Sequence, residues 1–70
     1  MKMVNVVSDN LKAVGYDEFE NFLVVDFRNG RSYRYLNVPA KEYDGLLAAA
    51  SKGTYFNRQI KDRYKFVKLA

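Results

Sequence analysis

The chain has 70 residues, of which 49% are hydrophobic and 16% aromatic, and its formal net charge is +4. This composition excludes intrinsic disorder and predicts one domain, residues 1–70, while the lack of cysteine and histidine excludes disulfides, thiolate metal sites and the commonest general base. We therefore expect a cytoplasmic protein with no metal and no cofactor, and no membrane partner, because no apolar run is long enough to cross a bilayer.

Three strands are predicted in the first half of the chain. A turn-forming cluster at residues 8–10 precedes a strand over residues 11–16, and a polar turn follows at 17–21. Residues 22–27 are rich in β-branched and aromatic side chains, which favours a strand most strongly there. Residues 32–36 alternate between polar and aromatic side chains, so we expect the returning strand of a hairpin.

The register of this hairpin follows from the alternation of its side chains. A two-residue turn at Asn29 and Gly30 would place apolar residues of one strand opposite polar residues of the other. A three-residue loop over 28–30, with Gly30 left-handed, instead places Val25 opposite Tyr33. We therefore predict that Leu23, Val25, Phe27, Tyr33 and Tyr35 share one buried face, and that Arg34 is exposed on the other.

Two helices and a final strand are predicted in the second half. Pro39 is suited to a helix start, and the apolar spacing through residue 50 predicts a helix lying on the sheet. Gly53 is predicted to end this helix with positive φ, and Thr54 to cap a short second helix over residues 55–61 that buries Phe56 and Ile60. Residues 64–69 read as a last strand.

These elements predict the α+β class. The expected architecture is an antiparallel sheet of three or four strands, with one main helix and one short helix packed on one face. Gly45 falls inside the main helix, where glycine lowers helix stability and so indicates close packing.

Positive charge is concentrated late in the chain. Residues 1–27 carry two lysines and five acids, whereas residues 51–70 carry six bases and one acid. Such asymmetry permits binding of an anionic partner. Alternatively, the basic residues form a solvated surface whose role is to keep a small protein soluble. The candidate nucleic-acid-binding residues are Arg28, Arg31, Arg34, Asn57, Arg58, Lys61 and Arg63.

The sequence contains no recognisable catalytic group. The acids Asp17, Glu18 and Glu20 lie together, but a polar turn between strands needs such residues for solubility alone. The four glycines are scattered and form no phosphate-binding loop. We therefore expect that the protein is not an enzyme.

An ordered series of short motifs runs along nearly the whole chain. It comprises Ser8, residues 13–17 (Ala-Val-Gly-Tyr-Asp), 27–30 (Phe-Arg-Asn-Gly), 33–35 (Tyr-Arg-Tyr), 38–39 (Val-Pro), 51–53 (Ser-Lys-Gly), 55–57 (Tyr-Phe-Asn) and Ile60. The series resembles the KTSC domain family, a module found alone in bacterial proteins and at the C-terminus of some lysyl-tRNA synthetases. The resemblance implies an RNA-binding role by its proximity to a tRNA enzyme, and it supplies no site residues.

Two functions follow as expectations. The first is a non-catalytic module that binds RNA through basic residues on phosphates, with little sequence preference. The second is a protein-interaction module that docks on a larger partner through an aromatic surface or a sheet edge. A continuous basic patch would favour RNA, and bases scattered around an exposed apolar patch would favour the protein partner.

Overall fold

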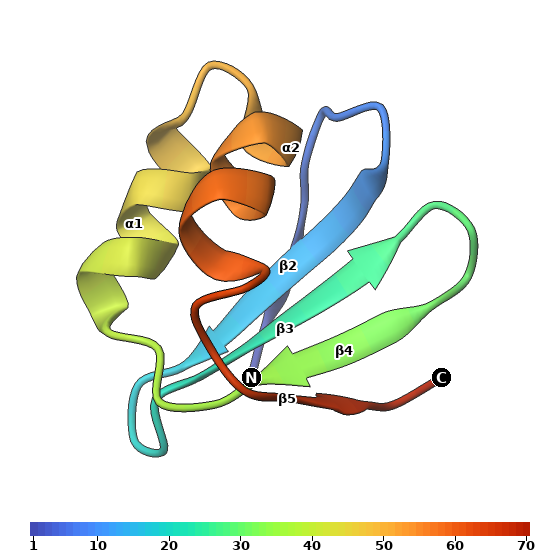
Figure 1. Cartoon of the computed structure of the whole chain (residues 1–70). Coiled ribbons are helices and arrows are strands. Elements are labelled where there is room, and N and C mark those ends of the chain that lie inside the picture. Colours follow the sequence, from blue (N-terminus) through green and yellow to red (C-terminus); the bar gives the residue numbers. More distant parts are fainter.

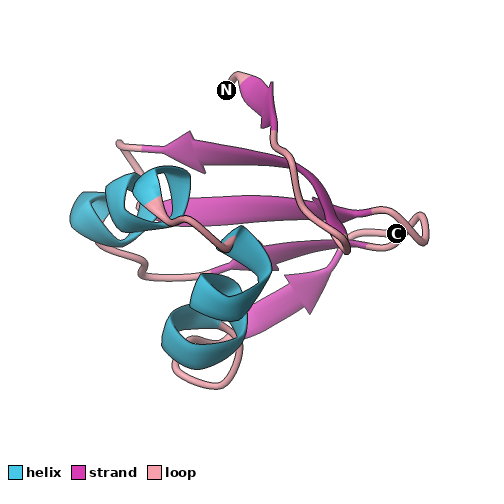
Figure 2. Ribbon diagram, turned by 90° about the horizontal axis from the view of Figure 1, so that it is seen from above, coloured by secondary structure: helices cyan, strands magenta, loops and turns pink.

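The computed structural model describes all 70 residues as one five-stranded antiparallel sheet with its helices on a single face (Figures 1 and 2). The strands follow one another across the sheet in the order β1-β2-β3-β4-β5. The elements are β1 (Met3–Asn5), β2 (Leu11–Asp17), β3 (Phe22–Phe27), β4 (Ser32–Tyr35), α1 (Ala40–Ala48), α2 (Lys52–Tyr55), the π-helical segment η1 (Phe56–Ile60) and β5 (Phe66–Lys68). No helix is both long and apolar enough to span a bilayer.

The α+β class is confirmed, but the predicted strand number of three or four was wrong. The additional strand is β1, which pairs with β2 so that Met3 lies opposite Gly15. Its three residues are half-buried or exposed and have no alternating buried pattern. The strand therefore forms through its pairing with β2, and the local sequence carries little sign of it.

The β3–β4 hairpin has the predicted bulged register. Val25 lies opposite Tyr33 and Leu23 opposite Tyr35. The amide of Phe27 donates to the carbonyl of Arg31 at 2.8 Å, and Gly30 has a φ of 91°. Glycine is the residue that adopts such a φ at no steric cost, so the loop closes with the apolar faces of both strands on the same side.

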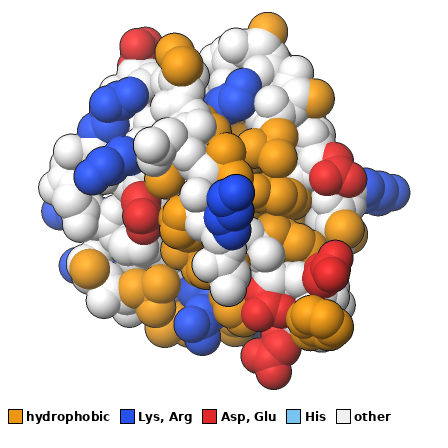
Figure 3. Space-filling model, turned by 180° about the vertical axis from the view of Figure 1, so that it is seen from behind, with side chains coloured by type: hydrophobic (Ala, Val, Ile, Leu, Met, Phe, Trp, Pro, Cys, Tyr) orange, Lys and Arg blue, Asp and Glu red, His pale blue; other side chains and the backbone are white.

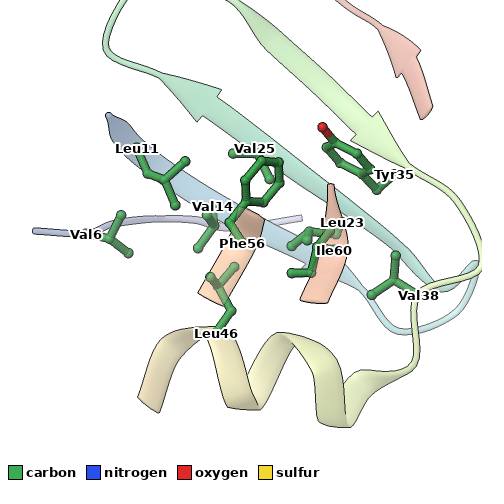
Figure 4. Close-up of a cluster of buried hydrophobic side chains, with 10 residues drawn as sticks. All are labelled: Val6, Leu11, Val14, Leu23, Val25, Tyr35, Val38, Leu46, Phe56 and Ile60. Atoms are coloured by element: carbon green, nitrogen blue, oxygen red, sulfur yellow. The ribbon is translucent and has the colours of Figure 1, made fainter. Parts of the chain in front are cut away.

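The core lies between the sheet and the helices. Leu46 of α1 and Phe56 and Ile60 of η1 pack against Leu23 and Val25 of β3 (Figure 4). The predicted burial of Phe56 and Ile60 is confirmed, since the two side chains are 2% and 0% exposed. The sheet and the short second helix thus meet through one continuous apolar cluster.

The junction between the helices differs from the prediction. Helix α1 ends at Ala48, and Ala49 is already extended with a ψ of 139°. Ser51, and not Thr54, caps α2: its hydroxyl accepts a hydrogen bond from the Thr54 amide at 3.3 Å. The prediction that Gly53 has positive φ was wrong, because Gly53 lies inside α2. Gly53 lies close to Asn10, since a Cβ atom at this position would be 2.8 Å from Asn10 Oδ1 and the Asn10 side chain would have to move.

Candidate functional site

A cleft lined by aromatic side chains opens between η1 and strands β4 and β5. Its volume is about 410 Å³, within the range of small-molecule sites. We call it the aromatic cleft. Its aromatic residues are Phe27, Tyr33, Tyr35, Phe56 and Phe66, and its polar residues are Asn10, Asn57, Lys61 and Asp62.

The aromatic rings of the cleft meet edge to face. The ring of Phe66 stands at 90° to that of Tyr33 with centroids 5.3 Å apart, and the ring of Tyr35 meets Phe56 at 5.4 Å. Phe66 is 55% exposed, whereas Tyr35 is 4% exposed. The cleft therefore has a fixed, buried floor and one open aromatic side chain at its rim.

Two tyrosine hydroxyls at the cleft make no hydrogen bond within the protein. The hydroxyls of Tyr16, Tyr55 and Tyr64 each donate a hydrogen bond to another residue. Those of Tyr33 and Tyr35 do not. Figure 4 shows the hydroxyl of Tyr35 directed away from the apolar side chains of Leu23 and Ile60. Burial, with smaller effects of Tyr33 and Asp62, raises the pKa of Tyr35 to about 12, so its hydroxyl is a neutral donor at physiological pH.

Three of the four polar side chains at the mouth come from η1 and the two residues that follow it. The amide of Lys61 donates to the carbonyl of Phe56, five residues earlier, at 2.9 Å. Such π turns occur frequently at functional sites. This turn presents Asn57 and Lys61 together on the cleft side of the helix. Lys68 of β5 lies opposite Tyr33 in the sheet register and so shares the same face.

A second, polar groove adjoins the aromatic cleft. It has a volume of about 450 Å³ and lies between the β1–β2 loop and the start of α2. Asn10 and Asn57 line both depressions. A ligand longer than one ring can therefore extend from the cleft into the groove across these two amides.

The predicted site residues are divided among several places. Asn57 and Lys61 line the aromatic cleft, but Arg58 lines a different groove beside the end of α1. The Arg28 side chain donates to the Ser8 carbonyl at 2.7 Å, and Arg63 donates to the side chain of Gln59 at 2.9 Å. Arg31 is exposed in the hairpin loop.

Arg34 lies on the opposite face of the sheet, as predicted. Its guanidinium carbon is 4.4 Å from the centroid of the Phe22 ring, and its strand neighbours Tyr33 and Tyr35 point to the helix side. No helix covers this outer face, yet Val24 there is 6% exposed. Figure 3 shows hydrophobic side chains gathered in the middle of this side, with separated basic side chains around and over them. Since Lys61 lines the cleft, Arg58 a different groove and Arg34 this outer face, the predicted bases do not form one continuous patch.

The sequence interpretation missed the aromatic cleft, including Phe66 at its rim. Phe66 and Lys68 belong to the edge strand β5, and the pairing of β5 with β4 brings Phe66 into the cleft and Lys68 onto the same face of the sheet. The weak alternation of residues 64–69 was the available signal, since it places Phe66 and Lys68 on one face. Recognising the cleft also required knowing that β5 lies beside β4.

Comparison with known proteins identifies the family. Residues 7–64 match the KTSC domain, and a protein of Tsukamurella paurometabola is 40% identical over 96% of this chain and 100% of its own length. The lysine–tRNA ligase of Nostoc punctiforme is 35% identical over 86% of this chain, which corresponds to 11% of the ligase. The crystal structure of a KTSC domain protein from Yersinia pestis is 30% identical, covers 99% of this chain and 97% of its own, and superposes with a TM-score of 0.95. The chain belongs to the KTSC domain family.

Proposed function

We propose that the chain is a non-catalytic module that binds RNA at the mouth of the aromatic cleft. The observation that carries the proposal is the position of Lys61 and Asn57 at that mouth, with Lys68 on the same face of the sheet. Lysine ammonium groups contact phosphates as point charges, and an amide adds a hydrogen bond to the sugar–phosphate backbone. Aromatic rings beside such groups are typical of surfaces that bind single-stranded nucleic acids.

The family context supports the same partner. A related domain occupies 11% of the lysine–tRNA ligase of Nostoc punctiforme, an enzyme whose name gives tRNA as its substrate. A domain carried on such an enzyme is held close to RNA. The contacts proposed for this chain rest on the residues of the cleft and not on this proximity.

The proposed contacts predict modest affinity with a measurable dependence on salt. Two lysine–phosphate contacts on a single strand correspond to a slope of log K against log salt of about −1.4. Titrating a labelled RNA of mixed sequence with the protein at low and moderate salt measures this slope. Absence of binding at low salt, by protein shown to be folded by circular dichroism, would reject the proposal.

A protein-docking function is the second candidate, because the outer face of the sheet carries no helix and shows apolar side chains with scattered bases around them, the arrangement expected for a protein partner. Val67 of the edge strand β5 is 49% exposed on this face, next to Arg34 of β4. Exposed apolar patches of this kind mark interaction surfaces. Comparing proteins captured from a cell lysate by the parent, by Val67→Lys and by Lys61→Gln tests it. If Val67→Lys fails to capture a protein that both the parent and Lys61→Gln capture, docking through this outer face is favoured.

A further inference from the structure

We infer that the aromatic cleft receives one unpaired nucleobase, so that the RNA bound by the domain is single-stranded. The inference rests on the proposed function, because it names the form of RNA that the same site takes. It is carried by three features of the cleft: a tyrosine hydroxyl without a partner in the protein, an exposed ring at the rim, and the balance of charge at the mouth.

The hydroxyl belongs to Tyr35, a residue that is 4% exposed as a whole. No side-chain polar atom is both fully buried and unpaired, so this hydroxyl, which has no partner in the protein, keeps access to solvent. The cleft is the depression that Tyr35 lines. The hydroxyl is therefore a free donor, and a ligand in the cleft with a hydrogen-bond acceptor would take the place of solvent as its partner.

The exposed ring belongs to Phe66, and it favours a flat aromatic ligand. Phe66 is 55% exposed and is held at 90° to Tyr33, so its orientation is fixed by packing while much of its surface faces solvent. Bases stack on such rings with little dependence on sequence. In an RNA duplex each base is already paired and stacked, so only an unpaired base can enter.

The charges at the mouth favour a neutral base over a phosphate inside the cleft. Lys61 and Asp62 both line it, and the carboxylate of Asp62 repels a phosphate brought into the cleft. The amides of Asn10 and Asn57 each offer a donor and an acceptor, which match the polar edge of any base. Lys61 is then left for the phosphate that flanks the inserted base.

The test compares one RNA sequence in two forms, as a labelled single strand and as a duplex with its complement. The proteins are the parent, Phe66→Ala, Tyr35→Phe, and Phe19→Ala as the matched control, since Phe19 is 90% exposed in the β2–β3 turn and does not line the cleft. Phe66→Ala should weaken binding of the single strand by about 5- to 150-fold, the range measured for loss of one stacked base. Tyr35→Phe, which keeps the ring, should weaken it several-fold, and Phe19→Ala should change nothing.

The outcomes separate this inference from the proposal on which it rests. Stronger binding of the single strand than of the duplex, together with the loss in Phe66→Ala, supports the cleft as a base site. Equal binding of both forms, unchanged in Phe66→Ala, would overturn the inference and leave RNA binding through phosphates intact. Absence of binding to either form at low salt, by folded protein, would overturn both.

Discussion

The backbone of Gly45 packs directly against the ring of Tyr55. A Cβ atom at position 45 would lie 2.8 Å from Cζ of that ring, which is closer than such atoms approach in proteins. The hydroxyl of Tyr55 also donates a 2.6 Å hydrogen bond to Glu42 Oε1 in the first turn of α1. The absence of a side chain in mid-helix thus allows α1 and α2 to close on one another, as the position of this glycine in the sequence indicated.

Gly45→Ala should destabilise the protein although alanine is the better helix former. The propensity gain is about 0.8–1.0 kcal/mol, and overpacking of this kind costs about 1–3 kcal/mol. We expect a lower Tm in thermal melting followed by circular dichroism. In a Tyr55→Leu background, which lacks the contacting ring atoms, the same substitution should raise Tm. A rise in Tm in both backgrounds would contradict the packing explanation.

Phe56→Ala should remove most of the stability of the domain. The side chain is 2% exposed and its ring contacts those of Phe27 and Tyr35. Truncating a buried phenylalanine costs about 3–5 kcal/mol, which is a large part of the stability of a small domain. Urea unfolding measures the loss. Phe19→Ala, the same chemical change at a side chain that is 90% exposed, should leave the midpoint within error. Similar midpoints for the two variants would show that Phe56 does not hold the core.

The hairpin and the buried face of the sheet were predictable because they depend on local patterns. The alternation in residues 22–27 and 32–36 admits a single register that keeps Val25 and Tyr33 on one face, and Asn29-Gly30 supplies the loop. Phe56 and Ile60 were likewise identified as buried by their spacing of four residues.

The remaining features depend on contacts between distant segments. Strand β1 exists because it pairs with β2, and Gly53 lies against the side chain of Asn10 from a distant part of the chain. The aromatic cleft requires β5 to pair with β4, which places Phe66 beside Tyr33. The alternation placed Arg34 on the outer face correctly, but it did not show that Lys61 and Asn57 line a cleft on the other side of the sheet.

The stability of the domain should fall in alkaline solution, in part through Tyr35. Burial raises the pKa of this hydroxyl to about 12 from its ordinary value of 10. Below pH 10 the tyrosine is neutral in both the folded and the unfolded protein, so its full contribution to the free energy of unfolding is present. Between pH 10 and about 12 the unfolded chain releases the proton and the folded protein retains it, so the free energy of unfolding decreases.

Urea unfolding at a series of alkaline pH values tests this linkage. Tyr35→Phe keeps the ring in the core but removes the ionising group, so the free energy of unfolding of the variant should decrease less steeply above pH 10 than that of the parent. All other ionisable groups are common to the two proteins, so the comparison isolates Tyr35. Parallel curves for the two proteins would show that burial does not suppress its ionisation.

Binding of RNA at the cleft is the central claim, and a matched pair of charge removals tests it most directly. Lys61 lines the cleft, whereas Arg34 lies on the opposite face of the sheet, and Lys61→Gln and Arg34→Gln each remove one positive charge. In titrations of a labelled single-stranded RNA at several salt concentrations, Lys61→Gln should weaken binding and flatten the salt dependence by about 0.7 in log K per log salt. Arg34→Gln should bind like the parent. Equal losses in the two variants would mean that binding follows net charge alone and would contradict a site at the cleft.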